Sequence, residues 1–251
     1  MSNQLSLNLD FRPAYGREDF FVGASNEEAI LRIDSWPDWG ISPFMIVYGD
    51  EGSGKKHLAS VWKTRSAAKV YDAKSFDDLD LNETLEKTPN IILHQLHLVL
   101  GDRENEEKLF HIYNHYIGLT DKRHALMTSR FAPQGLDIVI PDLRSRLLGS
   151  PNVSIRNPDD LLLTQVLGKQ LHDKGFQPSE DLLNYAVKLM ERSWTAPKKL
   201  ADTINKMSLD IQKPLTKKLV REALMKIEED GDFPKEEPSS YPVPPERKPI
   251  R

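Results

Sequence analysis

A glycine-rich run followed by a lysine constrains the fold of this chain more than any other segment. It occupies residues 49–54, directly before Lys55, and lies between the apolar residues 44–47 and the mostly apolar residues 58–62. This strand–loop–helix setting is the one that a phosphate-binding loop requires. Glycines let backbone N–H groups wrap an anion, the lysine reaches its terminal oxygens, and the helix N-terminus adds partial positive charge. The residues predicted to hold a nucleotide phosphate are Gly49, Gly52, Ser53, Gly54, Lys55, Lys56 and His57.

Two departures from an ATP-hydrolysing site affect the same metal ion. The position after the loop lysine should carry a hydroxyl for magnesium, but it is Lys56, which cannot ligate a cation and would repel one. After the apolar run 91–93, where an ATPase needs an acidic pair, the chain has His94 and Gln95. A neutral imidazole is a poor magnesium ligand, and an amide is no base. We therefore expect little or no self-hydrolysis, and ADP or ATP held with weak or no magnesium dependence. An empty former nucleotide site is the alternative.

The composition excludes several classes of protein. The chain of 251 residues has no cysteine, which excludes disulfides and cysteine-ligated zinc and agrees with a cytoplasmic setting. No apolar run approaches the ~20 residues of a membrane span, and the polar start lacks the regions of a signal peptide. The net charge of -4 gives no global attraction to nucleic acid.

Strands and helices are predicted to alternate in the first part of the chain. Ser25 followed by Glu28 is typical of a capping box and predicts a helix that ends near Trp36. The predicted strands are 44–48, 69–71, 90–93, 124–128 and 153–155, and the helices between them are 55–64, 82–87 and 104–117. This alternation indicates an α/β fold with a parallel sheet covered by helices on both faces.

Residues 158–228 are predicted to form a small all-α domain. Helices at 159–174, 179–192, 197–211 and 216–228 follow Asn157 and Pro158 without an intervening strand. From Gly231 onward, six prolines lie among charged residues. Residues 229–251 are therefore predicted to be a disordered, proline-rich tail.

Three further segments resemble the DnaA-related AAA+ family. Phe20–Asn26 is similar to the segment before the phosphate loop of the replication initiator DnaA, Thr128–Arg130 to the end of its sensor 1 strand, and Leu143–Leu147 to its arginine-finger box. The resemblance covers roughly residues 10–227 and implies a DnaA-like AAA+ nucleotide-binding α/β domain at 13–157 and a helical lid domain at 158–228. The tail is too short and too rich in proline for the DNA-binding domain of DnaA. We therefore expect no sequence-specific DNA binding, and the resemblance narrows to the Hda-like regulatory members of the family.

The first twelve residues resemble a peptide that binds the DNA polymerase sliding clamp. The residues that match the motif are Gln4, Leu5, Ser6, Leu7 and Leu9. The glutamine amide would occupy a polar notch and the leucines an apolar cleft. Residues 1–12 are therefore predicted to dock on the clamp. The period-two spacing of the leucines also fits an edge strand of the protein's own sheet.

Arg146 is the residue to which the resemblance gives a catalytic role. The resemblance implies that Arg146 is an arginine finger supplied in trans, that is, a guanidinium that reaches a nucleotide held by a neighbouring DnaA subunit. The implied function is negative regulation of bacterial chromosomal replication initiation, by docking on the clamp in the cytoplasm and stimulating hydrolysis of DnaA-bound ATP. The expected partners are the clamp (the beta subunit of DNA polymerase III) and DnaA, with a homodimer as a further option. A role as plain surface charges would also account for Arg144 and Arg146.

Two further groups of residues concern the nucleotide and metals. Lys198 occupies the position of the family's sensor 2 arginine and is predicted to contact the nucleotide, with a solvated lysine near a helix start as the alternative. His111 and His115 are four residues apart, and His94 and His97 are three apart. No carboxylate completes a zinc signature around them, so no metal site is predicted.

The sequence leaves two other functions open. One is a nucleotide-free AAA+ scaffold that binds the clamp and another partner without stimulating hydrolysis. The other is an autonomous replication ATPase, against which Lys56, His94 and Gln95 argue.

Overall fold

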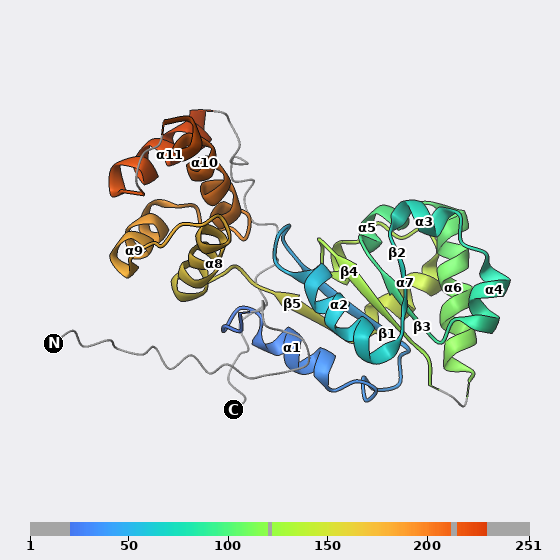
Figure 1. The fold of residues 1–251 in the computed structure, drawn as a ribbon. Coiled ribbons are helices and arrows are strands. Elements are labelled where there is room, and N and C mark those ends of the chain that lie inside the picture. Colours follow the sequence, from blue (N-terminus) through green and yellow to red (C-terminus); the bar gives the residue numbers. More distant parts are fainter. Residues whose placement is uncertain (1–20, 120–121, 212–214, 230–251) are drawn as a thin grey trace, which may run out of the picture. The chain divides into compact units, whose positions relative to one another are not determined.

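The computed structural model describes residues 21–119, 122–211 and 215–229 (Figure 1). The predicted clamp-binding residues, Gln4 to Leu9, and the predicted tail from residue 230 onward lie outside the described residues. The chain divides into two compact units. The described residues up to Val166, together with Arg192–Thr195, form an α/β unit, and those of 167–191 and from 196 onward form a helical unit.

The α/β unit is built on a parallel sheet whose described strands run in the order β2-β3-β4-β1-β5. The strands are β1 (Phe44–Gly49), β2 (Lys69–Tyr71), β3 (Asn90–Leu93), β4 (His124–Ser129) and β5 (Asn152–Ile155). Each lies within one residue of the range predicted from the sequence. The parallel sheet is confirmed, and its order places β4 next to β1, although the two strands are far apart in the chain.

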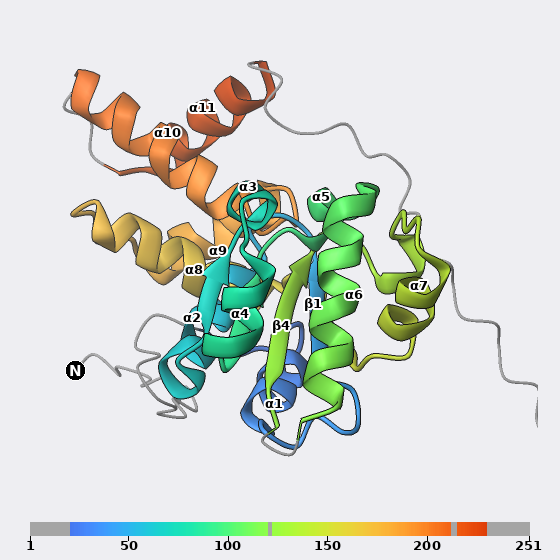
Figure 2. The same cartoon turned by 90° about the vertical axis from the view of Figure 1, so that its right-hand side faces the viewer.

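Alternate side chains of the strands pack on opposite faces of the sheet, because successive residues of a strand point to opposite sides. Met45, Val47 and Leu126 face α1 (Glu27–Asp34) and α2 (Lys55–Ser66). Phe44 and Met127 belong to the core on the other face. That face is covered by α3 (Ala73–Asp77), α4 (Leu81–Lys87), α5 (Leu96–Val99), α6 (Arg103–Ile117) and α7 (Pro141–Leu148), as Figures 1 and 2 show. The prediction of helices on both faces is confirmed.

The start of α1 differs from the prediction. Ser25 makes no capping box, since its buried Oγ has no hydrogen-bond partner among the described residues. The helix begins at Glu27, after Asn26. The Asn26 side chain accepts a hydrogen bond from the Gly23 N–H and donates one to the Phe21 carbonyl, both at 2.9 Å. It therefore holds the segment before the helix rather than a helix N–H group.

The helical unit is made of the second half of α8 (Asp160–Asp173) and of α9 (Glu180–Leu189), α10 (Ala196–Ile211) and α11 (Lys217–Glu229). α11 packs against both α9 and α10. The residues that it buries are Leu219, Val220, Ala223, Leu224 and Ile227, which recur at helical spacing. The fold class predicted from the sequence, a sheet unit followed by a helical region, is confirmed. Within the described residues, no helix combines the length and the apolar character that crossing a membrane would require.

Candidate functional site

The glycine-rich loop joins β1 to α2, and three of its glycines, Gly49, Gly52 (φ 78°) and Gly54, have backbone conformations that other residues rarely adopt. Gly49 has φ 151°, and a Cβ atom there would lie 2.5 Å from the Ile155 carbonyl oxygen of β5. Gly54 has φ 87° and precedes the first residue of α2. These conformations turn the chain sharply from the sheet into the helix. The first N–H groups of α2, which have no partner within the helix, therefore face the loop.

The Lys55 ammonium is held by the loop itself. Its Nζ donates to the carbonyl oxygens of Gly49 (2.7 Å) and Asp50 (2.6 Å) and to the Ser53 Oγ (3.1 Å). Burial lowers the pKa of Lys55 to about 8, although the carboxylates of Asp50 and Glu51 act in the opposite direction. The loop thus surrounds a cation with oxygen atoms, and an incoming phosphate would find this cation already in place.

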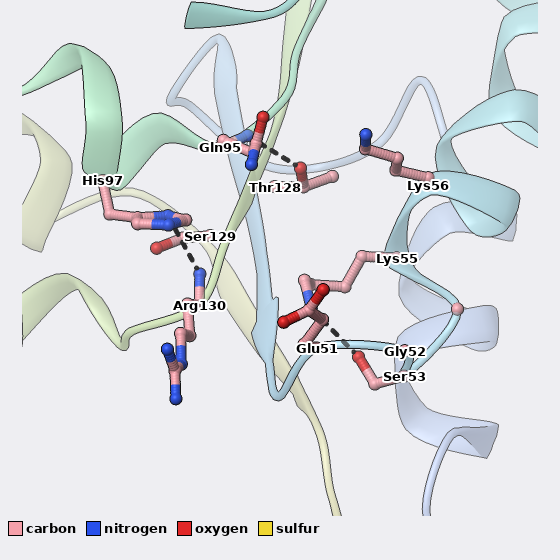
Figure 3. A pocket seen from close by; sticks show the side chains of 11 residues that line it. Glu51, Gly52, Ser53, Lys55, Lys56, Gln95, His97, Thr128, Ser129 and Arg130 are labelled. Atoms are coloured by element: carbon pink, nitrogen blue, oxygen red, sulfur yellow. Dashed lines mark hydrogen bonds between the residues drawn. The ribbon is translucent and has the colours of Figure 1, made fainter. Parts of the chain in front are cut away.

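A pocket of about 480 Å³ opens beside the loop, at the carboxyl ends of β1, β3 and β4 (Figure 3). Ligands of parallel α/β sheets bind at this edge of the sheet. The residues that line it are Glu51, Gly52, Ser53, Gly54, Lys55, Lys56, Gln95, His97, Thr128, Ser129 and Arg130. Among them, Lys55, Lys56 and Arg130 are cations and Glu51 is the carboxylate. The pocket is therefore suited to an anion.

The end of β3 carries no carboxylate. His94 Nδ1 lies 3.2 Å from the Thr128 Oγ1 of β4, and the Gln95 N–H donates to the same oxygen at 3.3 Å. The pKa of His94 is lowered, first by burial and then by the Lys56 ammonium, while Asp72 opposes the shift. A neutral imidazole and an amide thus stand where an ATPase needs acidic groups. In the described part of the chain, no group of three or more His, Asp or Glu side chains could hold a metal ion.

The end of β4 supplies the opposite wall of the pocket. The Arg130 N–H donates to His97 Nδ1 at 3.2 Å, and the Arg130 guanidinium lies 5.7 Å from the centre of the Phe131 ring. Burial lowers the pKa of His97, and the charges of Lys55 and Arg130 lower it further. His97 is therefore neutral at pH 7 and can accept this hydrogen bond.

A second group of residues surrounds α7, which carries the predicted arginine finger. Leu143 and Leu147 bury α7 in the core, Arg144 is exposed, and Arg146 is half-buried. The Arg146 guanidinium lies 4.8 Å from the centre of the Tyr113 ring and 5.3 Å from that of Phe110, both on α6. Its buried Nε has no hydrogen-bond acceptor among the described residues. Two aromatic rings of its own chain thus fix the orientation of this arginine.

The chain just before α7 is held by the same helix. Glu106 of α6 is fully buried, at 0% exposure. Its carboxylate accepts hydrogen bonds from the backbone N–H groups of Gly101 (2.9 Å), Val139 (2.9 Å) and Ile140 (2.7 Å). Hydrogen bonds to a charged acceptor are stronger than neutral ones. α6 therefore positions both the start of α7 and the arginine near its end (Figure 2).

Comparisons with known proteins give the fold a name. No family model matches the chain. It is 29% identical over 189 residues to an uncharacterized protein of Haemophilus influenzae, an alignment that covers 72% of this chain and 81% of that protein. Its structure is similar to that of domain III of the Thermotoga maritima replication initiation protein DnaA, with a TM-score of 0.68, 20% identity, and 82% of this chain and 94% of that chain covered. The fold is that of a DnaA-type AAA+ domain. The structure of AMPPCP-bound DnaA from Aquifex aeolicus is also similar, with a TM-score of 0.64, 19% identity, and 89% of this chain and 71% of that chain covered.

Within this AAA+ fold, the predicted phosphate-binding residues occupy different places. Gly52 to Lys56 line the pocket, whereas Gly49 shapes the loop at the end of β1. His57 is exposed in the first turn of α2 and does not line the pocket. Lys198 lies in the first turn of α10, in the helical unit, and its contact with a nucleotide stays a prediction.

The sequence analysis missed the contributions of His97, Ser129 and Arg130 to the pocket. The signal was present, because Thr128–Arg130 ends a predicted strand and resembles the sensor 1 segment. The strand order of the AAA+ sheet cannot be read from local sequence patterns, and it is this order that places β4 beside β1, the strand that carries the loop. The DnaA-type AAA+ fold is confirmed, and the Hda-like assignment stays a prediction.

Proposed function

We propose that this protein is a negative regulator of replication initiation that docks on the sliding clamp and lends Arg146 to DnaA-ATP. One observation carries the proposal. The end of the loop and the end of β3, where the resemblance places the groups for magnesium and the attacking water, hold Lys56, His94 and Gln95, while Arg146 lies in the last turn of α7. Such a chain is poorly equipped to hydrolyse ATP by itself, but it can still supply a guanidinium to a partner.

The magnitudes favour an arginine donor even though Arg146 rests on its own α6. Leaving the rings of Phe110 and Tyr113 costs about 0.5–2 kcal/mol, the range of a cation–π contact. An arginine finger supplied in trans accelerates phosphoryl transfer by ~10³–10⁵, which corresponds to about 4–7 kcal/mol. The gain at a partner's nucleotide therefore exceeds the loss within the chain.

Docking on the clamp would bring the arginine to DnaA at a defined stage of replication. The proposed peptide contains Gln4 and Leu7, whose side chains supply a polar anchor and an apolar anchor. Replacing both with alanine should abolish binding of the protein to clamp immobilised on a sensor surface while leaving its melting temperature unchanged. Retained binding would rule out this peptide as the docking segment.

Hydrolysis of ATP by the cognate DnaA, in the presence of clamp loaded on DNA, tests the arginine. Arg146→Ala should remove the stimulation and keep clamp binding. Arg144→Ala is the matched control, since it removes the same charge from an exposed position of the same helix and should leave stimulation intact. Equal rates with the wild-type and Arg146→Ala proteins would place the finger elsewhere.

A second function is favoured by the packing of Arg146 on Tyr113 and Phe110. If the guanidinium never leaves these rings, the protein is a clamp-binding scaffold that controls initiation by occupancy alone. The same assay separates the two functions, because a scaffold would bind the clamp without any stimulation of DnaA.

A further inference from the structure

We propose that the pocket at the ends of β1, β3 and β4 binds a diphosphate group without a divalent cation, and that Lys56 and Arg130 neutralise the charge that magnesium neutralises elsewhere. ADP and inorganic pyrophosphate both contain the diphosphate group that the proposal requires. This inference concerns the isolated chain and does not depend on the proposed function.

The first argument is the state of the cations that line the pocket. Lys55 directs its donors to three oxygens of the loop. By contrast, Lys56 and Arg130 are exposed and form no ion pair with the residues that the structure describes. Figure 3 shows Lys56 extending from the start of α2 towards Thr128 and Gln95, with Arg130 on the far side of the pocket. Two solvated cations thus remain available to a bound anion.

The second argument is the lack of oxygen ligands for magnesium among the described residues around the loop. Magnesium prefers an octahedral set of oxygens. The hydroxyl of Ser53 accepts from Lys55, that of Thr128 contacts His94 and Gln95, and that of Ser129 accepts from the Phe131 N–H. The remaining carboxylate of the lining is Glu51, on the exposed part of the loop. Hydroxyls in such arrangements are poorly placed to receive a metal.

The third argument is electrostatic. Burial is the main cause that lowers the pKa of His94, at the end of β3, and the positive charge of Lys56 lowers it further. A divalent cation at the same place would be repelled by this charge, whereas a phosphate oxygen would be attracted. Lysine and arginine both donate charge-assisted hydrogen bonds to phosphate. The substitution at position 56 therefore removes a metal ligand and adds a phosphate ligand.

Isothermal titration calorimetry of the full chain with ADP, and separately with pyrophosphate, tests the proposal. Each titration is run with EDTA and with magnesium. The wild-type protein should bind at least one of the two ligands as tightly in EDTA as in magnesium. Lys56→Thr should weaken binding in EDTA by roughly 10- to 100-fold, the loss of one charge-assisted hydrogen bond, and should regain affinity when magnesium is added.

Lys63→Thr is the matched control, because Lys63 is an exposed lysine in the last turn of the same helix. It should bind as the wild type does. Arg130→Ala should weaken binding in both buffers. Urea unfolding of each variant checks that the fold is retained, which the exposure of these side chains leads us to expect.

Three outcomes would overturn the proposal: wild-type affinity that falls tenfold or more in EDTA, unchanged affinity of Lys56→Thr in EDTA, or no binding of either ligand at millimolar concentration. Tighter binding of ADP than of pyrophosphate would support the site with a nucleotide as its ligand. Equal binding would support it with the diphosphate alone as the recognised group. Since neither the clamp nor DnaA is present, failure here leaves the test of Arg146 unaffected.

Discussion

The Arg146 guanidinium of α7 lies 4.8 Å from the centre of the Tyr113 ring, so the proposed arginine finger is oriented by α6, the α-helix that precedes α7 in the chain. The same helix, α6, holds the backbone in front of α7 through Glu106. A residue that must reach a partner's nucleotide needs a rigid base, and α6 supplies it at both ends of α7.

Phe110→Leu should raise the stimulation of DnaA about 2- to 5-fold, because it removes one of the two rings that Arg146 must leave to reach a partner's nucleotide, while keeping a half-buried apolar side chain. Phosphate release by DnaA on clamp-loaded DNA measures the effect. Added to Arg146→Ala, the substitution should change nothing further. A gain in that background would show that Phe110 acts through the fold rather than through Arg146.

Glu106→Ala should destabilise the α/β unit by about 3 kcal/mol or more, because it leaves three buried backbone N–H groups without their acceptor. Glu106→Gln keeps one acceptor oxygen and should cost less. Urea unfolding gives both values. Glu107→Ala is the control, since Glu107 is exposed and pairs with Arg103 at the surface, and it should cost below about 1 kcal/mol. Similar losses for Glu106→Ala and Glu107→Ala would contradict the assignment.

Gly49→Ala should destabilise the protein by more than Gly101→Ala. Both glycines have positive φ, 151° and 90°, but a Cβ at Gly49 would lie 2.5 Å from the Ile155 carbonyl oxygen, whereas nothing lies within 4 Å of a Cβ at Gly101. The conformation alone costs about 1–2 kcal/mol, and the clash at Gly49 adds to it. Equal unfolding free energies for the two variants would mean that β1 and β5 shift apart at no cost.

Binding of ADP, whose phosphates are already fully ionised there, should take up a proton on the alkaline side of pH 8. The free Lys55 has a pKa of about 8, lowered mainly by burial, and a bound anion raises it again. Between these two pKa values the complex carries one proton more than the free protein, so affinity falls as pH rises. We expect about a tenfold loss from about pH 7.5 to about pH 9.5. Calorimetry in two buffers of different ionisation enthalpy measures the uptake, and no uptake would mean that Lys55 does not contact the ligand.

The sheet was predictable from the sequence because β1, β3 and β4 contain apolar runs with clear ends, at residues 44–47, 91–93 and 125–127. The helices α3 and α5 were not, since they have five and four residues, too few to show a helical period. α3 forms around a local capping box between Asp72 and Ser75, and such a contact requires no apolar pattern.

The glycine loop could be located in the sequence, but the rest of the pocket could not. His97 and Arg130 meet the loop because β3 and β4 lie beside one another and β4 lies beside β1, an order that does not follow the chain. The support of Arg146 was hidden for the same reason, since Tyr113 and Arg146 come together only when α6 packs against α7. Local patterns thus predict elements, whereas the order of the strands decides which residues share a site.

The central claim is that one chain both docks on the clamp and supplies Arg146. Its most direct test is conversion of DnaA-bound ATP to ADP on clamp-loaded DNA with the wild-type protein, with Arg146→Ala, with the Gln4→Ala and Leu7→Ala double variant, and with an equimolar mixture of the two altered proteins. We predict stimulation by the wild type and basal hydrolysis in the other three reactions, because docking and the arginine must belong to the same molecule. Stimulation by Arg146→Ala equal to that of the wild type would contradict the claim.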